Sequence, residues 1–249
     1  MRNIWIIAKR EYDHYFISPI AYIVAFIILF TLGIYYVYVV RIASQQALMG
    51  GGNAPDITPF TWLFCFLLAF TAPALTMRLI SDEARMGTLE LMLTAPVRDF
   101  ELVIGKWLGA MLLILTILLV TLVYPIILNN YVDPGLDLKL TLAAYLGAIL
   151  VSASFLALGV GISSIFTNQF AAFFTTFGLF FILWFMMAIP ANMVQGSGSM
   201  FFQYLDMSSH FLDTFNRGTV NLSDIVYYIS LIALGLFTGT VAVEMRRWR

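Results

Sequence analysis

The sequence predicts an all-α polytopic membrane protein with six transmembrane helices. Of its 249 residues, 61% are hydrophobic and only 11% are charged, whereas soluble domains carry about 25% charged residues. Several apolar runs are long enough to cross a hydrocarbon core, which takes roughly 20 helical residues, and none alternates as membrane β-strands do. The six predicted spans lie at about 20–40, 60–80, 104–128, 141–165, 171–190 and 225–243.

The distribution of basic residues predicts the orientation of these spans. With the N-terminus in the cytoplasm, ten of the 13 Lys and Arg residues fall on the inner face. Only Arg41, Lys139 and Arg217 fall on the outer face. Cytoplasmic loops of membrane proteins carry an excess of Lys and Arg, so both termini are expected in the cytoplasm.

Composition and missing motifs exclude several functions. The net charge of −1 and the lack of a basic stripe argue against a nucleic-acid partner. The chain has one cysteine, Cys65, so it forms no intrachain disulfide. It has no phosphate-binding Gly-x-x-x-x-Gly-Lys-Ser/Thr loop and no hydrolase or metalloprotease signature. The span interiors are almost free of ionisable residues, which argues against ion-driven transport and indicates an energy source outside the membrane.

Residues 3–17 are predicted to form an amphipathic helix at the membrane interface. Apolar side chains recur at helical spacing, and Lys9 and Arg10 lie on other faces. Ser18-Pro19 then breaks the helix before the first span. The residues that share the apolar face are Ile4, Ile7, Ala8, Tyr12 and Tyr15.

The loop at 81–103 is predicted to contain a second surface helix. Ser81 is expected to cap a first helical turn, Gly87-Thr88 to interrupt it, and Asp99 to cap the third span. Residues 89–95, just before Pro96, are predicted to form a short helix whose apolar face would need to be covered by another surface. Lipid headgroups and a docked soluble protein both satisfy that need, and the residues alone do not decide between them.

The segment from 191 to 223, which we call the outer segment, is predicted to form short interfacial or re-entrant helices. By contrast, 41–59 reads as a loop and 166–170 as a tight helical hairpin. Asp206, Met207 and His210 are weak metal-ligand candidates. Their number and spacing match no standard site, so we predict no metal and favour a structural hydrogen bond for His210.

Spans four and five carry two packing signals. Gly159 and Gly161 allow close approach of another helix. Span five carries a stripe of phenylalanines, which lipid or the protein core explains at least as well as a pore wall or a dimer seam. The stripe comprises Phe170, Phe173, Phe174, Phe177 and Phe181.

Three stretches in order resemble one family. Ser81-Asp82-Glu83-Ala84-Arg85-Met86-Gly87-Thr88-Leu89-Glu90-Leu91-Met92-Leu93-Thr94-Ala95-Pro96-Val97 is similar to the cytoplasmic signature of type-2 ABC transporter permeases. Within that group the chain resembles the permeases of gliding motility and of copper-enzyme maturation. The other two stretches are 159–169 and 209–228. The resemblance covers essentially the whole chain.

The resemblance implies a half-transporter. Two copies, or one copy with a related permease, would sit in the inner membrane of a bacterium above two separate ATPase subunits that hold ATP and Mg²⁺, and this chain would bind no cofactor. Residues 3–17, with Trp5, Lys9, Arg10 and Tyr12, would be an elbow helix. A coupling helix would dock in the ATPase through Asp82, Glu83, Arg85, Gly87, Thr88, Leu89, Glu90, Leu91, Met92 and Pro96.

The resemblance also assigns roles within the membrane. Phe173, Phe174, Phe177, Phe181, Gly159 and Gly161 would line the path or the seam between copies, and His210, Phe211, Arg217 and Gly218 would belong to an outer gate. An ATP-independent channel or scaffold is the alternative, and a membrane-embedded enzyme is a weaker third. The cargo stays open among lipidic, polysaccharide, peptide and copper- or sulfur-related molecules.

Overall fold

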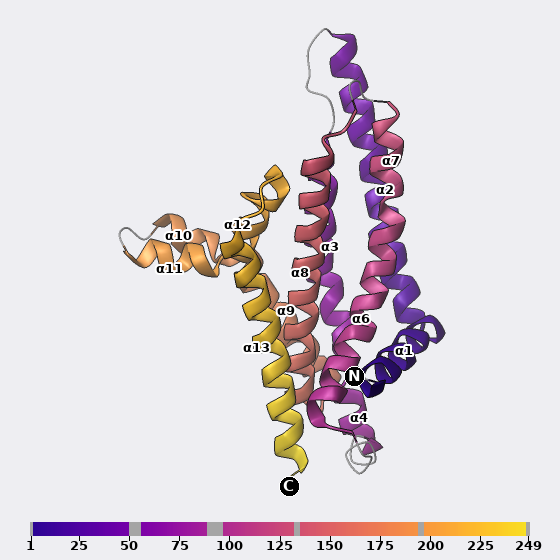
Figure 1. Ribbon diagram of the computed structural model, residues 1–249, viewed down its shortest axis with the longest axis vertical. Coiled ribbons are helices and arrows are strands. Elements are labelled where there is room, and N and C mark those ends of the chain that lie inside the picture. The colour runs from indigo at the N-terminus through magenta and orange to yellow at the C-terminus, as the bar shows by residue number, and fades with distance from the viewer. Residues whose placement is uncertain (1, 50–55, 89–96, 132–134, 194–196, 248–249) are drawn as a thin grey trace.

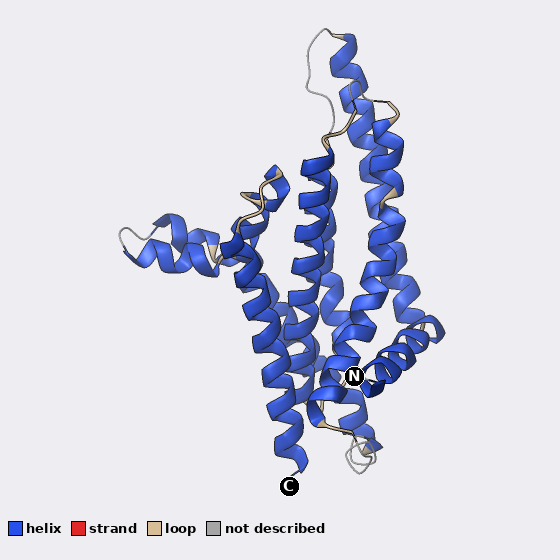
Figure 2. Cartoon of the chain, in the orientation of Figure 1, coloured by secondary structure: helices blue, strands red, loops and turns tan. Residues whose placement is uncertain are grey.

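The computed structural model describes residues 2–49, 56–88, 97–131, 135–193 and 197–247. In these ranges the regular structure is helical, without strands (Figure 2). Six helical stretches are long and apolar enough to cross a membrane, which confirms the predicted all-α class and the six spans. They run Pro19–Gln46, Thr58–Met86, Asp99–Asn129, Leu138–Ile165, Gln169–Ala191 and Leu222–Arg246.

The spans are built from both long and broken helices. The first, second, fourth and sixth contain α2 (Pro19–Leu48), α3 (Thr58–Thr76), α8 (Leu138–Ile165) and α13 (Leu222–Arg247). The third joins α6 (Asp99–Thr121) to α7 (Val123–Asn129). The fifth joins α9 (Gln169–Phe181) to the π-helical turn η1 (Ile182–Met186) and α10 (Ala188–Met193).

The predicted loop at 41–59 is partly wrong, because α2 continues to Leu48. Residues 41–48 contain neither glycine nor proline, so nothing stops the helix when its apolar run ends. Helix α3 then begins at Thr58. At the other predicted boundaries, α8 ends at Ile165 and α9 begins at Gln169, which confirms the tight hairpin between spans four and five.

Helix α8 lies at the centre of the bundle. It is the most buried of the six spans, with 78% of its apolar window inside the protein. Glycines allow its neighbours to approach: a Cβ on Gly159 would lie 2.3 Å from Thr76 Oγ1 of α3, and one on Gly161 would lie 2.6 Å from Gly235 O of α13. The core is therefore organised by close backbone contact around α8.

Helix α1 (Arg2–Ile17) lies obliquely beside the bundle and packs on α6 (Figure 1). Gly105 and Gly109, four residues apart on α6, make this contact close. A Cβ on Gly105 would lie 2.7 Å from Ile7 Cβ, and one on Gly109 would lie 2.6 Å from Glu11 Cβ. The predicted helix at 3–17 is therefore present, but its apolar face covers α6 of the same chain.

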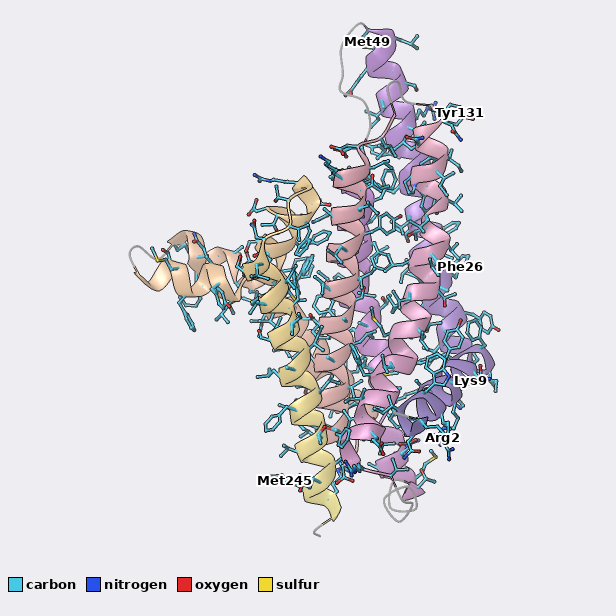
Figure 3. All side chains as sticks on the ribbon, viewed as in Figure 1. Arg2, Lys9, Phe26, Met49, Tyr131 and Met245 are labelled. Carbon is cyan, nitrogen blue, oxygen red and sulfur yellow. The ribbon has the colours of Figure 1, made fainter. Side chains whose placement is uncertain are left out.

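Both ends of the described chain lie at one end of the bundle. Arg2, Lys9 and Met245 lie near that end, and Met49 and Tyr131 lie at the opposite one (Figure 3). The short helix α4 (Ser81–Met86) lies at the same end as α1 and the end of α13 (Figure 1). We call this end the α4 end.

The outer segment is helical, as predicted. It contains the end of α10, α11 (Ser197–Leu205), α12 (Met207–Leu212) and the turn η2 (Phe215–Arg217). Helices α10 and α11 extend sideways from the bundle, while α12 lies over the beginning of α13 (Figure 1). Phe215 packs on α8, where a Cβ on Gly147 would lie 2.5 Å from Phe215 Cβ.

Candidate functional site

The α4 end contains a buried lysine in a transmembrane helix. Lys106 lies two turns into α6 and its side chain is only 1% exposed. A buried ammonium is costly unless it is paired and hydrogen-bonded. The partners of Lys106 therefore identify the elements that are linked by ion pairs at the α4 end.

Two carboxylates from different elements neutralise Lys106. Its Nζ donates to Glu11 Oε1 of α1 at 3.0 Å and to Glu83 Oε1 of α4 at 2.8 Å. Arg10 adds a second cation, with Nη2 2.9 Å from Glu11 Oε1 and 3.7 Å from Glu83 Oε1. We call these four residues the Lys106 junction. It links α1, α4 and α6 through a balanced set of two cations and two anions.

Glu83 leaves part of this junction unsatisfied. Its Oε1 is shared between Lys106 and Arg10, whereas its Oε2 is buried and has no hydrogen-bond partner among the described residues. A cavity of about 400 Å³ lies beside it, lined from α1 by His14 and Tyr15 and from the end of α3 by Leu75 and Arg78, among others. The junction thus borders open space, so α4 is not packed tightly on every side.

The same helix is also fastened to the hairpin between spans four and five. The backbone N–H groups of Ile80 and Ser81 both donate to Ser163 Oγ at 3.2 Å, and Gln169 Nε2 donates to Asp82 Oδ1. Ser163 and Gln169 belong to the second stretch of the family resemblance, and Ser81 and Asp82 to the first. The two stretches therefore meet in space, at the beginning of α4.

Glu11 is ionised throughout the physiological range. Burial by itself raises the pKa of its carboxyl, but the charge of Lys106 and hydrogen bonds from Arg10 and Lys106 outweigh burial. Together they lower the pKa of Glu11 below its ordinary value of 4.5. A carboxyl whose pKa is lower in the folded state stabilises that state above its ordinary pKa, and this stabilisation is lost as the pH falls.

We therefore expect the contribution of Glu11 to stability to vanish in acid. Near neutral pH, Glu11→Gln should unfold at a lower temperature than the unchanged chain, and the difference should shrink as the pH falls below 4.5. Thermal unfolding in detergent across this pH range measures the difference. Asp13→Asn, which changes an exposed carboxylate of the same helix, is the control. A difference that does not change on acidification would contradict the expectation.

Two predicted helix caps are displaced by one residue. Helix α4 is capped by Ile80, and Ser81 is its first residue, with its hydroxyl donating back to Met77 O. Helix α6 is capped by Arg98, whose N–H donates to Glu101 Oε2 at 3.2 Å, so Asp99 is its first residue. At the start of α4, the backbone N–H groups of Ile80 and Ser81 donate to Ser163 Oγ of α8, whereas the start of α6 is held by the local contact with Glu101. The predicted break is correct, because α4 ends at Gly87 with φ of 72°.

The predicted coupling residues lie partly in and just after α4 and partly outside the described residues. Glu83 lies in the Lys106 junction, and Arg85 forms an exposed ion pair with Asp82 at 3.1 Å. Thr88 donates to Glu83 O at 3.4 Å. Leu89, Glu90, Leu91, Met92 and Pro96 lie outside the described residues.

The predicted elbow residues differ in their surroundings. Tyr12 contacts α6, with its hydroxyl 3.0 Å from Thr116 Oγ1, and Arg10 joins the Lys106 junction. Trp5 and Lys9 are exposed. The helix therefore presents one face to α6 and leaves an apolar residue, Trp5, exposed.

The predicted path or seam residues separate into two groups. Gly159 and Gly161 are buried by packing within the chain, so they are not available to a second copy. The phenylalanines lie at the surface, where Phe174 is 66% and Phe181 is 42% exposed. Phe177 stacks with Phe173 and Phe181 at ring distances of 6.2 Å. Phe177 also contacts Phe70 of α3, which makes one aromatic surface of spans two and five.

The predicted outer-gate residues form structural contacts. Phe211 is fully buried, and Arg217 pairs with Asp213 at 2.6 Å in solvent. Gly218 has φ of 79° and lies against Leu140 of α8. His210 contacts Asp224 at 2.6 Å, in agreement with the expected structural hydrogen bond, although its partner was not among the candidates.

The weak metal-ligand candidates have separate structural roles. Asp206 caps α12, with Oδ1 accepting from Ser208 N at 3.1 Å, and Met207 is buried in the core. Within the described ranges, no three His, Cys, Asp or Glu side chains are gathered as a metal would require.

Sequence reasoning missed Lys106, Glu11 and the pair Gly105 and Gly109. One signal was available: Lys106 is a lone charge inside a long apolar run, and such a residue needs a partner. Glu11 and Glu83 could not be paired with it in advance, because 95 and 23 residues separate them from Lys106.

The fold and the junction define a class of protein: a multi-pass helical membrane protein whose surface helices are ion-paired to a transmembrane helix. A sequence model of the family described as "ABC-2 family transporter protein" matches residues 5–241. The chain therefore belongs to the ABC-2 transporter family, whose members are permease subunits of ABC transporters. A comparison with curated proteins finds no significant match.

Proposed function

We propose that this chain is the membrane-spanning subunit of an ATP-driven exporter, coupled to separate ATPase subunits at its α4 end. The Lys106 junction carries the proposal, because a force applied to the segment that follows α4 would reach α1 and α6 through buried ion pairs. Ser163 and Gln169 would pass the same movement to α8 and α9. Both ends of the described chain lie at this end (Figure 3), and the excess of basic residues supports a cytoplasmic location for it.

We also propose that the aromatic surface of α3 and α9 lines the path or the seam between two permease copies. The observation behind this proposal is the continuity of the surface, which joins Phe66 and Phe70 on α3 to Phe177 and Phe185 through ring distances of 5.1–6.2 Å. Planar side chains in this arrangement can repack as helices move apart without exposing polar groups. A surface of this kind suits an amphipathic or lipidic cargo.

Co-purification with neighbouring gene products tests the coupling. The tagged chain is expected to bring down a soluble protein with a phosphate-binding loop, and native mass spectrometry should find two copies of each. Leu91→Asp and Glu90→Lys should lose that partner, because each puts a wrong charge on the predicted docking helix. Met245→Asp changes a residue that is 64% exposed at the same end and should retain it.

The outcome separates the two function classes. A chain that purifies alone, or a partner that Leu91→Asp does not displace, would contradict ATPase coupling through this segment. A channel or scaffold would then be the better interpretation. A complex with a single permease copy would contradict the proposed seam between permease copies, but not the proposed coupling to the ATPase.

A further inference from the structure

A histidine and an aspartate connect the outer segment to the sixth span. His210 of α12 and Asp224 of α13 have side chains that are 12% and 6% exposed. The His210 ring stacks on Tyr227 at 4.1 Å with an angle of 19°, and Tyr204 of α11 meets it edge-on at 5.6 Å. These contacts fix the plane of the ring, so the direction of each ring nitrogen is defined.

Both ring nitrogens face oxygens. Nδ1 lies 2.6 Å from Asp224 Oδ1, and Nε2 lies 3.1 Å from the backbone oxygen of Tyr204. A carbonyl oxygen only accepts hydrogen bonds, and so does an ionised carboxylate, whereas a neutral imidazole has a single N–H to donate. A neutral histidine beside an ionised aspartate would therefore leave one of the two contacts without a proton.

One additional proton satisfies both contacts. It resides either on the ring, as imidazolium beside carboxylate, or on Asp224, as a carboxylic acid that donates to Nδ1. In both arrangements the pair holds one proton more than neutral histidine with ionised aspartate. Asp224 Oδ2 is buried and has no hydrogen-bond partner among the described residues, so an ionised Asp224 would depend on this proton for its neutralisation.

The surrounding titratable groups do not provide a substitute. Tyr227 and Tyr228 of α13 donate their hydroxyl protons to the backbone oxygens of Leu205 and Met207. Asp206 of α12 accepts from Ser208 and is itself acidic. On α11, Tyr204 offers His210 its ring edge and backbone oxygen. None of these described neighbours places a cation beside Asp224.

We propose that His210 and Asp224 form a proton-binding site that holds the outer segment on α13. Exposed histidines in general lose their proton above about pH 6.5, where exposed carboxyls are already ionised. Separation therefore releases one proton above that pH. While the closed pair keeps its proton, the ratio of closed to separated molecules falls by up to about tenfold for each further pH unit, so the closed state is favoured in acid and weakened as the pH rises.

Distance measurements between spin labels test this site in the full-length chain. Labels on Met200→Cys of α11 and Leu234→Cys of α13, both at exposed positions, report the separation in a Cys65→Ala background. One short distance is expected at about pH 5.5, with a second, longer population at about pH 8.5. An unchanged distance distribution between these pH values would overturn the proposal.

Asp224→Asn separates proton binding from simple packing. The amide donates to Nδ1 of a neutral ring, whose Nε2–H then donates to Tyr204 O, so both contacts form without the additional proton. This variant is expected to remain closed at both pH values. If it keeps the pH dependence of the unchanged chain, the proton is bound elsewhere and the proposal is wrong.

The protonation state can also be observed directly, without relying on the Asp224 variant. The chain has two histidines, His14 and His210, so His14→Gln leaves one ring to be observed by ¹⁵N NMR. Near neutral pH we expect two N–H protons on that ring, or one N–H together with a protonated Asp224 carboxyl. A ring with one bare nitrogen beside an ionised Asp224 would overturn the proposal. His210→Gln, which leaves only the exposed His14, is the reference.

Discussion

Replacing Lys106 with methionine is expected to destabilise the chain by about 3–5 kcal/mol, because breaking a buried ion pair leaves a buried charge without its partner. Glu11 and Glu83 would then face each other with only Arg10 between them, and Arg10 lies 3.7 Å from Glu83 Oε1. Chemical unfolding of the purified protein measures the loss. Lys9→Met, which removes an exposed lysine from α1, is the matched control and should change stability little.

A neutral version of the junction separates stability from coupling. Glu11→Gln, Glu83→Gln and Lys106→Met together remove every charge buried with Lys106, so most of the lost stability should return. The ionic link from α4 to α1 and α6 would still be absent. If the proposed function holds, this triple variant folds and binds the ATPase, but ATP hydrolysis no longer drives transport. A Lys106→Met chain as stable as Lys9→Met would contradict the energetic role of the junction.

Replacing Gly235 with alanine is expected to destabilise the pairing of α8 and α13. A Cβ at this position would lie 2.4 Å from Ala157 C, 2.5 Å from Ala157 O and 2.6 Å from Leu158 N. These are backbone atoms, so no side-chain rotation relieves the clash and the helices must separate. Overpacking of a core costs about 1–3 kcal/mol, and here the upper part of that range is expected.

The matched control is another helical glycine. A Cβ on Gly178 of α9 would have no other side chain or neighbouring backbone within 4 Å among the described residues. Gly178→Ala should therefore be neutral or should stabilise the chain by up to about 1 kcal/mol through helix propensity. Gly235→Ala should thus destabilise the chain, whereas Gly178→Ala should not. Unfolding in detergent compares them directly, and equal effects at both positions would mean that α8 and α13 are free to move apart.

Local sequence signals predicted much of the helical organisation. Six apolar runs indicated six spans because the bilayer requires a minimum apolar length, and Ser18-Pro19 and Gly87 marked breaks because of their backbone preferences. Some helix boundaries were predicted wrongly by a residue or more. Ser81 and Asp99 are each one residue inside their helices, and α2 continues beyond its apolar run to Leu48.

The sites were less predictable because their members are far apart in sequence. The resemblance singled out Glu83, but not its ion-pair partner Lys106, which is 23 residues away. Asp206 and His210 were grouped as weak metal-ligand candidates, whereas the structure pairs His210 with Asp224 and Asp206 caps α12. Gly159 and Gly161 were correctly interpreted as points of close approach, yet the approaching helices belong to the same chain.

Hydropathy and helical periodicity are local properties that the bilayer selects, so the class of protein, the six spans and the helix that precedes the first span follow from the order of residues alone. Tertiary packing was needed to establish which charges neutralise Lys106, which helix α1 covers and which acid holds His210. Those choices depend on which surfaces meet when the helices pack. Burial makes each of these pairings energetically necessary, because a charge or a polar atom removed from water needs a partner at hydrogen-bonding distance.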